Sequence, residues 1–465
     1  MSKINRLMFR EYDIRGRVNE QELNPKTMNL IGQAFAIFLK RRRNVSKLVL
    51  GHDFRSYSEN LAENFKNGLL SAGCETIDIG LTLTPMIYFA QYHFKTQGGA
   101  IVTASHNPNG WSGLKLADGY SKTLLGEELQ EVYRIAERED FEKGRGHFAK
   151  KDVTKAYSEA IASRISLKKP IKVVLECGNG TAGKFAPPIF KKVGCEVIEL
   201  FCDLDSSFPH HNPNPELKEA KEALAKKVKE VKADIGVSID GDGDRLGIVD
   251  EKGENIWSDR ALILLARQVL DKKAGAKIIF DVKCTRALKE DIKARGGIPI
   301  MWKTGHSYIK KKLHEEKADL AGERSGHFFL VDDWYGFDDA IFSSLKLIEY
   351  LSGQEETMSE LIASTPPYVI SPTIHVNCPD HQKYRVVDSL TKDFKKEYGL
   401  EKVIDINGAR VEFDDGWGLV RASSNEPVLV LVFEARTKER LNEIKSIFRE
   451  KLNKYPEVNK EWKNE

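Results

Sequence analysis

Short apolar segments along the chain repeatedly end in polar loops, and a helical pattern of apolar residues follows each loop. These segments are Leu48–Leu50, Ala100–Val102, Val173–Leu175, Gly236–Ile239, Ile278–Phe280 and Ile298–Trp302. Strands that alternate with helices in this way are typical of parallel α/β layers. Because such sheets bind ligands outside the carboxyl ends of their strands, the polar loops are the places to look for chemistry.

The strand-loop-helix pattern restarts near residues 170 and 277, after charged helical connectors. We therefore predict three similar doubly wound α/β domains, at residues 1–150, 151–255 and 256–366. The pattern then changes to clustered strands, at Val403–Ile406, Ala409–Phe413, Trp417–Val420 and Val428–Phe433, with a helix near 437–453. Residues 367–465 are predicted to form a smaller α+β domain.

Composition narrows the class of protein. The chain has 465 residues, of which 41% are hydrophobic, so each domain can bury a core. A net charge of +3 gives no basic footprint for nucleic acid. The six cysteines include no C-x-x-C pair, which favours reduced thiols and a cytoplasmic location. We expect no signal peptide and no membrane span, because the N-terminal residues are charged and no apolar run reaches about 18 residues.

The loop Asp240-Gly241-Asp242-Gly243-Asp244-Arg245 directly follows a predicted strand. Three carboxylates this close repel one another unless a cation neutralises them, and hard cations such as Mg²⁺ prefer oxygen ligands. The intervening glycines let the backbone bend so that alternate side chains converge. We interpret Asp240, Asp242 and Asp244 as a metal site; the alternative is a solvated acidic turn.

Two other motif families resemble this loop less well. An EF-hand needs glycine at the sixth position, where Arg245 stands. A haloacid-dehalogenase-type phosphotransferase would carry a hydroxyl residue where Asp244 stands. The stretch Gly178–Lys184 matches a dinucleotide fingerprint and nearly a P-loop, but Phe185 replaces the hydroxyl residue that a P-loop requires. We prefer a tight strand-to-helix turn for it.

Ser105 lies in the loop Thr103-Ala104-Ser105-His106-Asn107-Pro108, after another predicted strand. A serine in an exposed, tightly held turn is a nucleophile only if a base or cation activates it. Taken alone, Ser105 is more often a turn-capping hydroxyl. A metal loop elsewhere in the chain strengthens the catalytic interpretation, because phosphoryl transfer needs charge neutralisation beside the nucleophile.

Further loops carry groups that suit phosphate or sugar recognition. Arg15, in Phe9–Gly16, can bind a phosphate or form a surface ion pair. Glu323 and Ser325 alternate in an extended loop and can read sugar hydroxyls together. Arg421 begins a loop rich in hydroxyl and amide groups, which suits phosphate capture. We interpret His210-His211 as part of a proline-rich structural turn.

Together these loops resemble the α-D-phosphohexomutase family, and most closely its bacterial phosphomannomutase/phosphoglucomutase branch. The markers stand in family order over essentially the whole chain, at 9–16, 103–108, 240–245, 322–327 and 421–423. The resemblance implies four domains around a central cleft. It also implies a reversible conversion of hexose 1-phosphate to hexose 6-phosphate, of mannose or glucose.

The resemblance also implies roles for individual residues. Ser105 is expected to be phosphorylated and to ligate Mg²⁺ together with the three aspartates. Arg15 and Lys115 are expected beside the phosphoserine, and His306 or His327 to assist proton transfer. The substrate contacts implied by the family are Arg245, Lys283, Glu323, Ser325, His327, Arg421, Ser423 and Asn425. Phosphoserine would donate to the free hydroxyl, and the bisphosphate would turn end for end before returning a phosphate to Ser105.

The expected cofactors are Mg²⁺ and a hexose 1,6-bisphosphate activator, and the partners are sugar phosphates, without nucleic acid or membrane. The oligomeric state implied is a monomer or a small homo-oligomer. Arg324 departs from the family pattern, because it puts a charge between two sugar-contacting positions. The alternatives are a phosphoglucosamine mutase and, less favoured, a phosphoserine-dependent sugar phosphatase.

Overall fold

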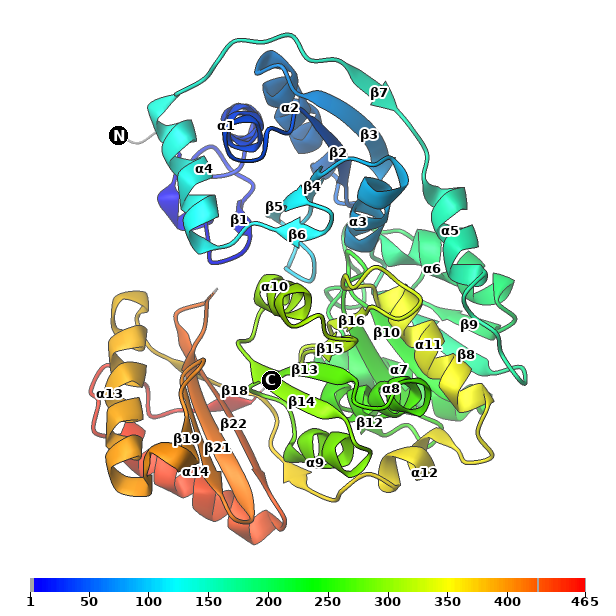
Figure 1. The fold of residues 1–465 in the computed structure, drawn as a ribbon, viewed down its shortest axis with the longest axis vertical. Coiled ribbons are helices and arrows are strands. Elements are labelled where there is room, and N and C mark those ends of the chain that lie inside the picture. The colour runs from blue at the N-terminus through cyan, green and yellow to red at the C-terminus, as the bar shows by residue number, and fades with distance from the viewer. Residues whose placement is uncertain (1–3, 425, 465) are drawn as a thin grey trace. The chain divides into compact units, whose positions relative to one another are not determined.

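The computed structural model describes residues 4–424 and 426–464, and the chain in it forms two compact units. The first unit comprises Met1–Ile256 and Gly326–Ser359, and the second comprises Trp257–Ser325 and Glu360–Glu465. The described residues form four sheets, and most of their strands are labelled in Figure 1.

The first sheet has seven strands in the order β1-β5-β4-β2-β3-β7, with β6 paired to β5. Its strands are β1 (Ile14–Arg17), β2 (Lys47–His52), β3 (Glu75–Leu81), β4 (Gly98–Val102), β5 (Trp111–Gly119), β6 (Lys122–Thr123) and β7 (Phe148–Lys150). Its helices are η1 (Arg6–Met8), α1 (Pro25–Arg43), α2 (Ser58–Ser71), α3 (Thr84–His93) and α4 (Gly126–Arg138). Strands β4, β2, β3 and β7 are parallel, whereas β1 and β5 run against their neighbours.

The second sheet has five strands in the order β12-β11-β10-β8-β9, and β9, β8 and β10 are parallel. Its strands are β8 (Lys172–Glu176), β9 (Glu196–Leu200), β10 (Ile235–Ile239), β11 (Leu246–Asp250) and β12 (Asn255–Ile256). The helices of this part are α5 (Thr154–Ala162), α6 (Ala182–Lys192) and α7 (Lys218–Val231). Later in the chain, β16 (Phe328–Leu330) and α11 (Ala340–Ser352) also belong to the first unit.

The second unit begins with the parallel strands β14-β13-β15. These strands are β13 (Lys277–Asp281), β14 (Ile298–Trp302) and β15 (Leu320–Gly322), and the helices are α8 (Ser258–Lys272), α9 (Arg286–Ala294) and α10 (His306–Glu316). Helix α12 (Met358–Ala363) spans the point where the chain re-enters this unit.

The last sheet is antiparallel, in the order β19-β20-β21-β22-β18-β23, with β17 paired to β22. It contains β17 (Val369–Ile370), β18 (Ile374–Asn377), β19 (Val403–Ile404), β20 (Ala409–Phe413), β21 (Gly416–Ala422), β22 (Val428–Ala435) and β23 (Lys463–Asn464). Its helices are α13 (Asp380–Tyr398), the short η2 (Leu400–Lys402) and α14 (Lys438–Leu452). The sheet therefore matches the predicted change from parallel layers to an α+β domain.

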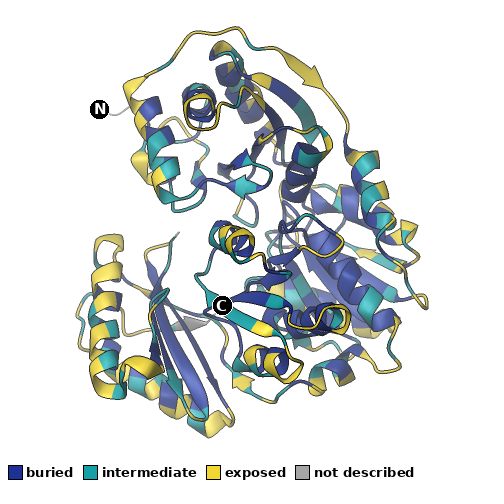
Figure 2. Cartoon of the chain, in the orientation of Figure 1, coloured by how far each residue is buried: buried dark blue, intermediate teal, exposed yellow. Residues whose placement is uncertain are grey.

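Burial follows the predicted hydrophobic pattern. Strands β4 and β10 are buried at every position, and Figure 2 shows the central strands of the sheets in dark blue. A strand with both faces covered reads as a continuous apolar run, which is how these segments stood out in the sequence. The predicted fold class is confirmed: three α/β layers precede one α+β domain.

Candidate active site

Ser105 lies just beyond the carboxyl end of β4 and is 3% exposed. Its backbone has a φ of 52°, a left-handed conformation that is uncommon for a residue with a side chain. The Ser105 hydroxyl donates to Asp240 Oδ2 at 2.9 Å, and Nδ1 of His106 lies 3.0 Å from Ser105 Oγ. The serine that the sequence marked is therefore joined directly to the acidic loop of the second sheet.

The acidic loop follows β10, and its three carboxylates are fully buried. Asp240 Oδ1 accepts the backbone N–H groups of Gly243, Asp244 and Arg245, at 3.0 to 3.1 Å, so this residue holds its own loop in shape. Asp242 Oδ1 and Asp244 Oδ1 are buried and accept no hydrogen bond from the described residues. Two carboxylate oxygens are therefore left available for a cation.

Lys115, on β5, is the ammonium group nearest to these carboxylates. Its Nζ lies 2.8 Å from Asp242 Oδ2 and also forms an ion pair with Asp244. Burial alone would lower the pKa of Lys115, but Asp242 and Asp244 raise it above its ordinary value. Burial would likewise raise the pKa of Asp242, but Lys115 and the Thr84 hydroxyl hold it below its ordinary range. The pair is therefore charged.

Asp240 behaves differently from Asp242. Burial, followed by repulsion from Asp242 and Asp244, raises its pKa well above the ordinary range. One lysine does not neutralise three carboxylates in a water-excluded site, so a bound cation would stabilise the cluster further. The ligand atoms of the three aspartates lie within 4.8 Å of one another, which is close enough to hold one metal ion. An all-oxygen donor set suits a hard divalent cation.

Two arginines flank the cluster. Arg15, on β1, donates to Asp13 Oδ2 at 3.2 Å and to the backbone carbonyl of Thr103, in the serine loop. Arg245 donates through Nε to His327 Nε2 at 3.1 Å. Burial would lower the pKa of Arg245, but Glu216 and the aspartates of the loop raise it.

His327 links this cluster to a further carboxylate. Its Nδ1 lies 3.2 Å from Asp338 Oδ2 and 3.7 Å from Asp244 Oδ1. The first unit thus brings together eight of the predicted site residues: Ser105, Asp240, Asp242, Asp244, Lys115, Arg15, Arg245 and His327.

The predicted sugar-reading residues gather in the second unit, at the carboxyl ends of β13, β14 and β15. Lys283 Nζ lies 3.6 Å from Asp281 Oδ2. Glu323 Oε1 accepts the backbone N–H of Gly305 at 2.5 Å, which joins this loop to the one that precedes His306. His306 is buried at the first position of α10, and Ser325 is half-buried.

The predicted phosphate loop follows β21 in the last sheet. Arg421 is 7% exposed, and its Nη2 donates to Ser424 Oγ at 3.5 Å. Its Nε is buried and has no hydrogen-bond partner among the described residues. Ser423 Oγ accepts the backbone N–H of Glu426 at 3.3 Å, and the predicted residue Asn425 lies outside the described residues.

Comparison with known proteins identifies this arrangement. The chain matches four successive family descriptions, "Phosphoglucomutase/phosphomannomutase" alpha/beta/alpha domains I, II and III and C-terminal domain, over residues 6–143, 155–253, 257–368 and 374–451. It is 42% identical to a phosphomannomutase/phosphoglucomutase of Pseudomonas putida, over 96% of this chain and 95% of that protein. The chain belongs to the phosphoglucomutase/phosphomannomutase family.

Two further relatives support the same family. A phosphoglucomutase of Neisseria gonorrhoeae is 38% identical, over 98% of this chain and 99% of that protein. The crystal structure of a phosphoglucomutase/phosphomannomutase family protein from Burkholderia thailandensis is also 38% identical, with a TM-score of 0.91 over 98% of this chain and 99% of that one. The predicted family is thus confirmed, and the chain is a phosphohexomutase, an isomerase that interconverts hexose phosphates. The described residues form no helix with the length and hydropathy of a membrane span.

The departure from the family pattern at Arg324 has a structural explanation. This side chain is 3% exposed and lies over the Trp257 ring, with 4.4 Å between the guanidinium carbon and the ring centroid. It pairs with Asp259 Oδ2 at 3.2 Å and donates to the carbonyl of Ser371 at 2.9 Å. The charge of Arg324 is therefore paired inside the second unit by Asp259, and not by Glu323 or Ser325, while its Nε has no hydrogen-bond partner among the described residues.

Sequence reasoning missed several residues that shape the phosphohexomutase site. Thr84, at the start of α3, donates its hydroxyl to Asp242 Oδ2 at 2.7 Å, and its backbone N–H to the Asp242 carbonyl at 2.9 Å. Asp338 lies beside His327, and Asp53 and Arg55 hold the serine loop. Asp53 and Thr84 both follow strands of the first sheet, so position at a strand end was the available signal.

The glycine fingerprint at 178–183 is explained by packing within the first unit. A Cβ added at Gly180 would lie 3.0 Å from the Cα of Gly241, and one at Gly183 would lie 2.0 Å from the carbonyl of Cys202. Only glycine allows backbones to approach this closely. These glycines therefore support the metal loop and the adjoining strand end, as a structural turn would.

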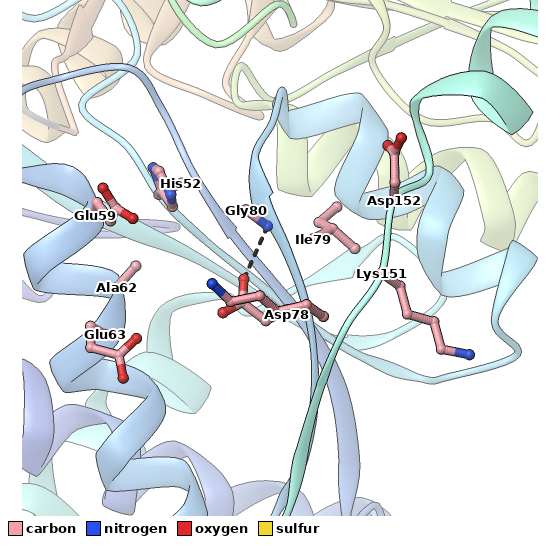
Figure 3. A pocket seen from close by; sticks show the side chains of 10 residues that line it. His52, Glu59, Ala62, Glu63, Asp78, Ile79, Gly80, Lys151 and Asp152 are labelled. Atoms are coloured by element: carbon pink, nitrogen blue, oxygen red, sulfur yellow. Dashed lines mark hydrogen bonds between the residues drawn. The ribbon is translucent and has the colours of Figure 1, made fainter.

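A separate pocket of about 350 Å³ opens on the first unit, beside the ends of β2 and β3. Figure 3 shows its lining, which includes His52, Glu59, Asp78, Lys151 and Asp152. Asp78 Oδ1 accepts the backbone N–H of Gly80 at 3.0 Å there. Its lining contains none of the predicted site residues, so we assign this pocket no part in the reaction.

Proposed function

We propose that this phosphohexomutase works through a phosphoserine at Ser105 and a hexose 1,6-bisphosphate intermediate. The observation that carries the proposal is the contact of Ser105 Oγ with Asp240 Oδ2, at 2.9 Å inside a buried acidic cluster. A hydroxyl in that place would need compensating positive charge before it could carry a phosphoryl group. Lys115, Arg15 and Arg245 supply part of that charge.

Ser105, Asp240, Asp242 and Asp244 are the residues that would hold the metal ion, which we propose to be Mg²⁺. Asp242 Oδ1 and Asp244 Oδ1, which accept no hydrogen bond from the part of the chain that the structure describes, support this donor set. When bound, the ion supplies positive charge that offsets the charge on the transferring phosphoryl oxygens. Thr84 and Lys115 both occupy Asp242 Oδ2, which leaves its other oxygen for the cation.

The proposed reaction has two balanced half-reactions. In the first, the bond from phosphorus to Ser105 Oγ breaks, and a bond forms from phosphorus to the free hydroxyl oxygen of the hexose phosphate. The hydroxyl proton passes to a base, and Ser105 Oγ takes up a proton. In the second, the hexose 1,6-bisphosphate presents its other phosphate. The bond from that phosphorus to the sugar oxygen breaks as a bond forms from phosphorus to Ser105 Oγ. The Ser105 proton passes to a base, and the sugar oxygen takes up a proton to leave a free hydroxyl. Hexose 1,6-bisphosphate also serves as the activator, because it can load an unphosphorylated enzyme.

We propose His327, in preference to His306, as the residue that accepts the proton from the substrate hydroxyl. His327 belongs to the same unit as Ser105, and its Nδ1 lies 3.2 Å from Asp338. A carboxylate in that position favours the tautomer with hydrogen on Nδ1, so that Nε2 is the proton acceptor. In this structure His327 Nε2 accepts a hydrogen bond from Arg245 Nε. That hydrogen bond therefore has to break before Nε2 can accept a proton from a substrate hydroxyl. His306 remains a second proposal.

The remaining predicted residues are proposed to bind the substrate. Glu323 and Ser325 would read sugar hydroxyls, and Lys283 would contact the sugar phosphate. Arg421, Ser423 and Asn425 would hold the phosphate that does not react. The buried Arg421 Nε, with no partner among the described residues, supports an anionic ligand at that loop.

We propose mannose 1-phosphate and glucose 1-phosphate as the substrates. The satisfied charge of Arg324 supports this, since it leaves the sugar loop free of an extra cation. We keep the domain boundaries near residues 150, 255 and 366, and a monomer or small homo-oligomer, as proposals. The six cysteines, which are free and buried, agree with a cytoplasmic location.

A coupled assay tests the proposed function. Mannose 1-phosphate, glucose 1-phosphate and glucosamine 1-phosphate are each supplied with Mg²⁺ and a trace of glucose 1,6-bisphosphate. We expect the first two to give 6-phosphates without release of inorganic phosphate. A preference for glucosamine 1-phosphate would overturn the substrate assignment, and stoichiometric inorganic phosphate would instead indicate a phosphatase.

A further inference from the structure

Each of the three α/β layers carries a buried carboxylate at the same place in its sheet. In each layer this carboxylate follows or ends a strand that has a parallel neighbour on both sides: β2 between β3 and β4, β8 between β9 and β10, and β13 between β14 and β15. The carboxyl ends of these strands carry Asp53, Glu176 and Asp281, which are 3%, 1% and 0% exposed. Charged side chains are rarely buried to this degree unless they have partners, so the repetition calls for a common role.

In the first layer, Asp53 reaches across to the loop that carries Ser105. Its Oδ2 accepts the Thr103 hydroxyl at 2.9 Å and the Ala104 backbone N–H at 3.1 Å. Its Oδ1 accepts the backbone N–H of Arg55 at 3.2 Å. Arg55 in turn donates to the carbonyl of Ser105 at 3.1 Å, so both sides of the strained serine are fixed from this strand end.

In the second layer, Glu176 reaches the strand that leads to the metal loop. Its Oε2 accepts the hydroxyl of Ser238, its register partner on β10, at 2.5 Å, two residues before Asp240. Its Oε1 accepts the backbone N–H of Gly178 and lies 3.4 Å from His211 Nε2. His211 belongs to the proline-rich turn, in which the carbonyl of Pro213 accepts the backbone N–H of Gly241 at 3.1 Å.

In the third layer, Asp281 reaches both neighbouring loops. Its Oδ1 accepts the backbone N–H of Arg324 at 3.3 Å, between the sugar-reading positions Glu323 and Ser325. Its Oδ2 accepts the hydroxyl of Thr304 at 2.8 Å, two residues before His306, and lies 3.6 Å from Lys283 Nζ. One carboxylate thus joins three of the segments that carry predicted site residues: those of Lys283, of His306, and of Glu323 and Ser325.

The three networks share two features. Each carboxylate binds a group two positions further along its own chain, at Arg55, Gly178 or Lys283. Each also accepts a hydrogen bond from the neighbouring parallel strand, or from the loop that follows it, and that loop carries the predicted chemistry. A position that recurs in three sheets with three different loops is a feature of the architecture.

We propose that Asp53, Glu176 and Asp281 are positioning residues, one for each functional loop: Asp53 for phosphoryl loading of Ser105, Glu176 for metal binding, and Asp281 for sugar-phosphate binding. The inference rests on the proposed function for the roles of the loops. If the three carboxylates only stabilised the fold, replacing any one of them would lower stability and weaken phosphoryl loading, metal binding and sugar-phosphate binding together. If each one positions its own loop, its replacement should weaken mainly the activity of that loop.

The test uses the full-length isosteric variants Asp53→Asn, Glu176→Gln and Asp281→Asn. Three quantities are measured for each: the single-turnover rate of phosphate incorporation from glucose 1,6-bisphosphate, the Kd for Mg²⁺ alone by calorimetry, and the KM for glucose 1-phosphate. We expect Asp53→Asn to slow phosphate incorporation, Glu176→Gln to raise the Mg²⁺ Kd, and Asp281→Asn to raise the KM, each about tenfold or more. Glu176→Gln and Asp281→Asn should change the other two quantities by less than about threefold, and Asp53→Asn should leave the KM within the same range.

Matched controls remove a buried carboxylate of the same layer that contacts none of these loops. They are Asp118→Asn (partner Arg43), Asp250→Asn (partners Lys252 and Glu254) and Asp291→Asn (partner Arg267). The controls should lower the unfolding temperature while leaving all three quantities near the wild-type values. If an amide variant does not fold, Thr103→Val, Ser238→Ala or Thr304→Val is used in its place. Each of these removes the hydroxyl that donates to the carboxylate, and the same quantity should change as in the corresponding amide variant.

The result that would overturn the inference is a proportional change of all three quantities in every variant, or changes no larger than in the controls. A different result would show that the proposed function itself is wrong. If wild-type enzyme incorporates no more phosphate than Ser105→Ala, the phosphoserine is wrong, whereas the Mg²⁺ and KM measurements still decide the roles of Glu176 and Asp281.

Discussion

The reacting centre around Ser105 and the loop that begins at Arg421 differ in how firmly their functional atoms are held. Ser105, Asp240 and Asp242 are buried, and each is bonded to groups from other segments of the first unit. Arg421 has one long side-chain hydrogen bond, of 3.5 Å, and a buried Nε with no partner among the described residues. One region is organised in advance, and the other retains a donor for a ligand.

The difference matches the two tasks. Transfer of a phosphoryl group depends on fixed charges at fixed distances, so a preorganised site lowers the barrier most. A loop that must hold either phosphate of a bisphosphate, in two orientations, gains from groups that a ligand completes. The antiparallel sheet beneath the loop is firm: Arg410 lies 3.6 Å above the Trp417 ring and donates to the carbonyls of Val282 and Cys284. The loop therefore keeps a buried donor, Arg421 Nε, that a ligand can complete.

The largest effect should come from the centre of the reacting site. Ser105→Ala should lower mutase turnover by several orders of magnitude, roughly 10⁴-fold or more, because it removes the hydroxyl proposed to carry the phosphoryl group. The measurement is the rate of glucose 1-phosphate conversion at saturating Mg²⁺ and glucose 1,6-bisphosphate. Unchanged folding by circular dichroism is the control, and turnover near the wild-type value would rule out the phosphoserine.

A smaller loss is expected from a change to the cation ligands. Asp242→Asn should reduce the rate roughly 100-fold and raise the Mg²⁺ concentration for half-maximal activity, because the buried site loses one negative charge. Thr84 can still donate to the amide oxygen, so the loop should keep its shape. Asp250→Asn, which alters a carboxyl outside the cluster, is the control. An unaltered Mg²⁺ titration in Asp242→Asn would contradict the ligand assignment.

Substitutions in the loop that begins at Arg421 should weaken substrate binding more than they slow phosphoryl transfer. Arg421→Gln removes a fixed cation and should raise the KM for glucose 1-phosphate roughly tenfold, with a smaller change in kcat. Arg440→Gln removes an arginine of the same domain that pairs with Asp415 and Glu443, and its KM should stay near wild type. Equal KM values in the two variants would show that Arg421 does not hold the phosphate.

The smallest effect concerns a buried carboxyl that belongs to neither region. Burial raises the pKa of Asp339 to about 7, against an ordinary 3.8, while Tyr157 and the Phe342 backbone N–H oppose the shift. Between these two values the folded chain binds more protons than the unfolded chain, so stability falls as pH rises through this range. Asp339→Asn should therefore gain unfolding temperature relative to wild type from pH 5 to pH 8, by roughly 2 °C or more.

Tyr157→Phe provides the control for that prediction. It removes the hydroxyl that donates to Asp339 Oδ2 at 2.9 Å but keeps the carboxyl. Because that hydrogen bond opposes the raised pKa of Asp339, the variant should still lose stability as pH rises, and the loss should extend to higher pH than in wild type. If Asp339→Asn and wild type show the same dependence, the raised pKa is wrong.

The sequence could predict the elements and loops that depend on local pattern. Ser105 and the aspartates stand after continuous apolar strands, and the structure brings them together because those strands share a sheet edge or lie in adjoining sheets of one unit. The partners of a buried charge could not be predicted in this way. From the sequence, Arg324 is a charge between two sugar-contacting positions, whereas in the structure it contacts Asp259, Trp257 and Ser371. These contacts join residues 47 to 67 positions apart, which no local pattern encodes.

Thr84 and Asp53 were missed for the same reason. A threonine at a helix start reads as a local cap, and an aspartate after a strand reads as a turn. Their importance comes from bonds to Asp242 and to the serine loop, 158 and 50 to 51 positions away.

The measurement that tests the account most directly is the phosphate content of Ser105. Wild-type enzyme is incubated with glucose 1,6-bisphosphate and Mg²⁺, and the peptide that contains Ser105 is weighed by mass spectrometry before and after addition of glucose 6-phosphate. The account predicts close to one phosphate per chain, on Ser105, which the sugar phosphate removes and water does not. An unmodified Ser105 peptide in an enzyme that still turns over, or phosphate lost only as inorganic phosphate, would contradict it.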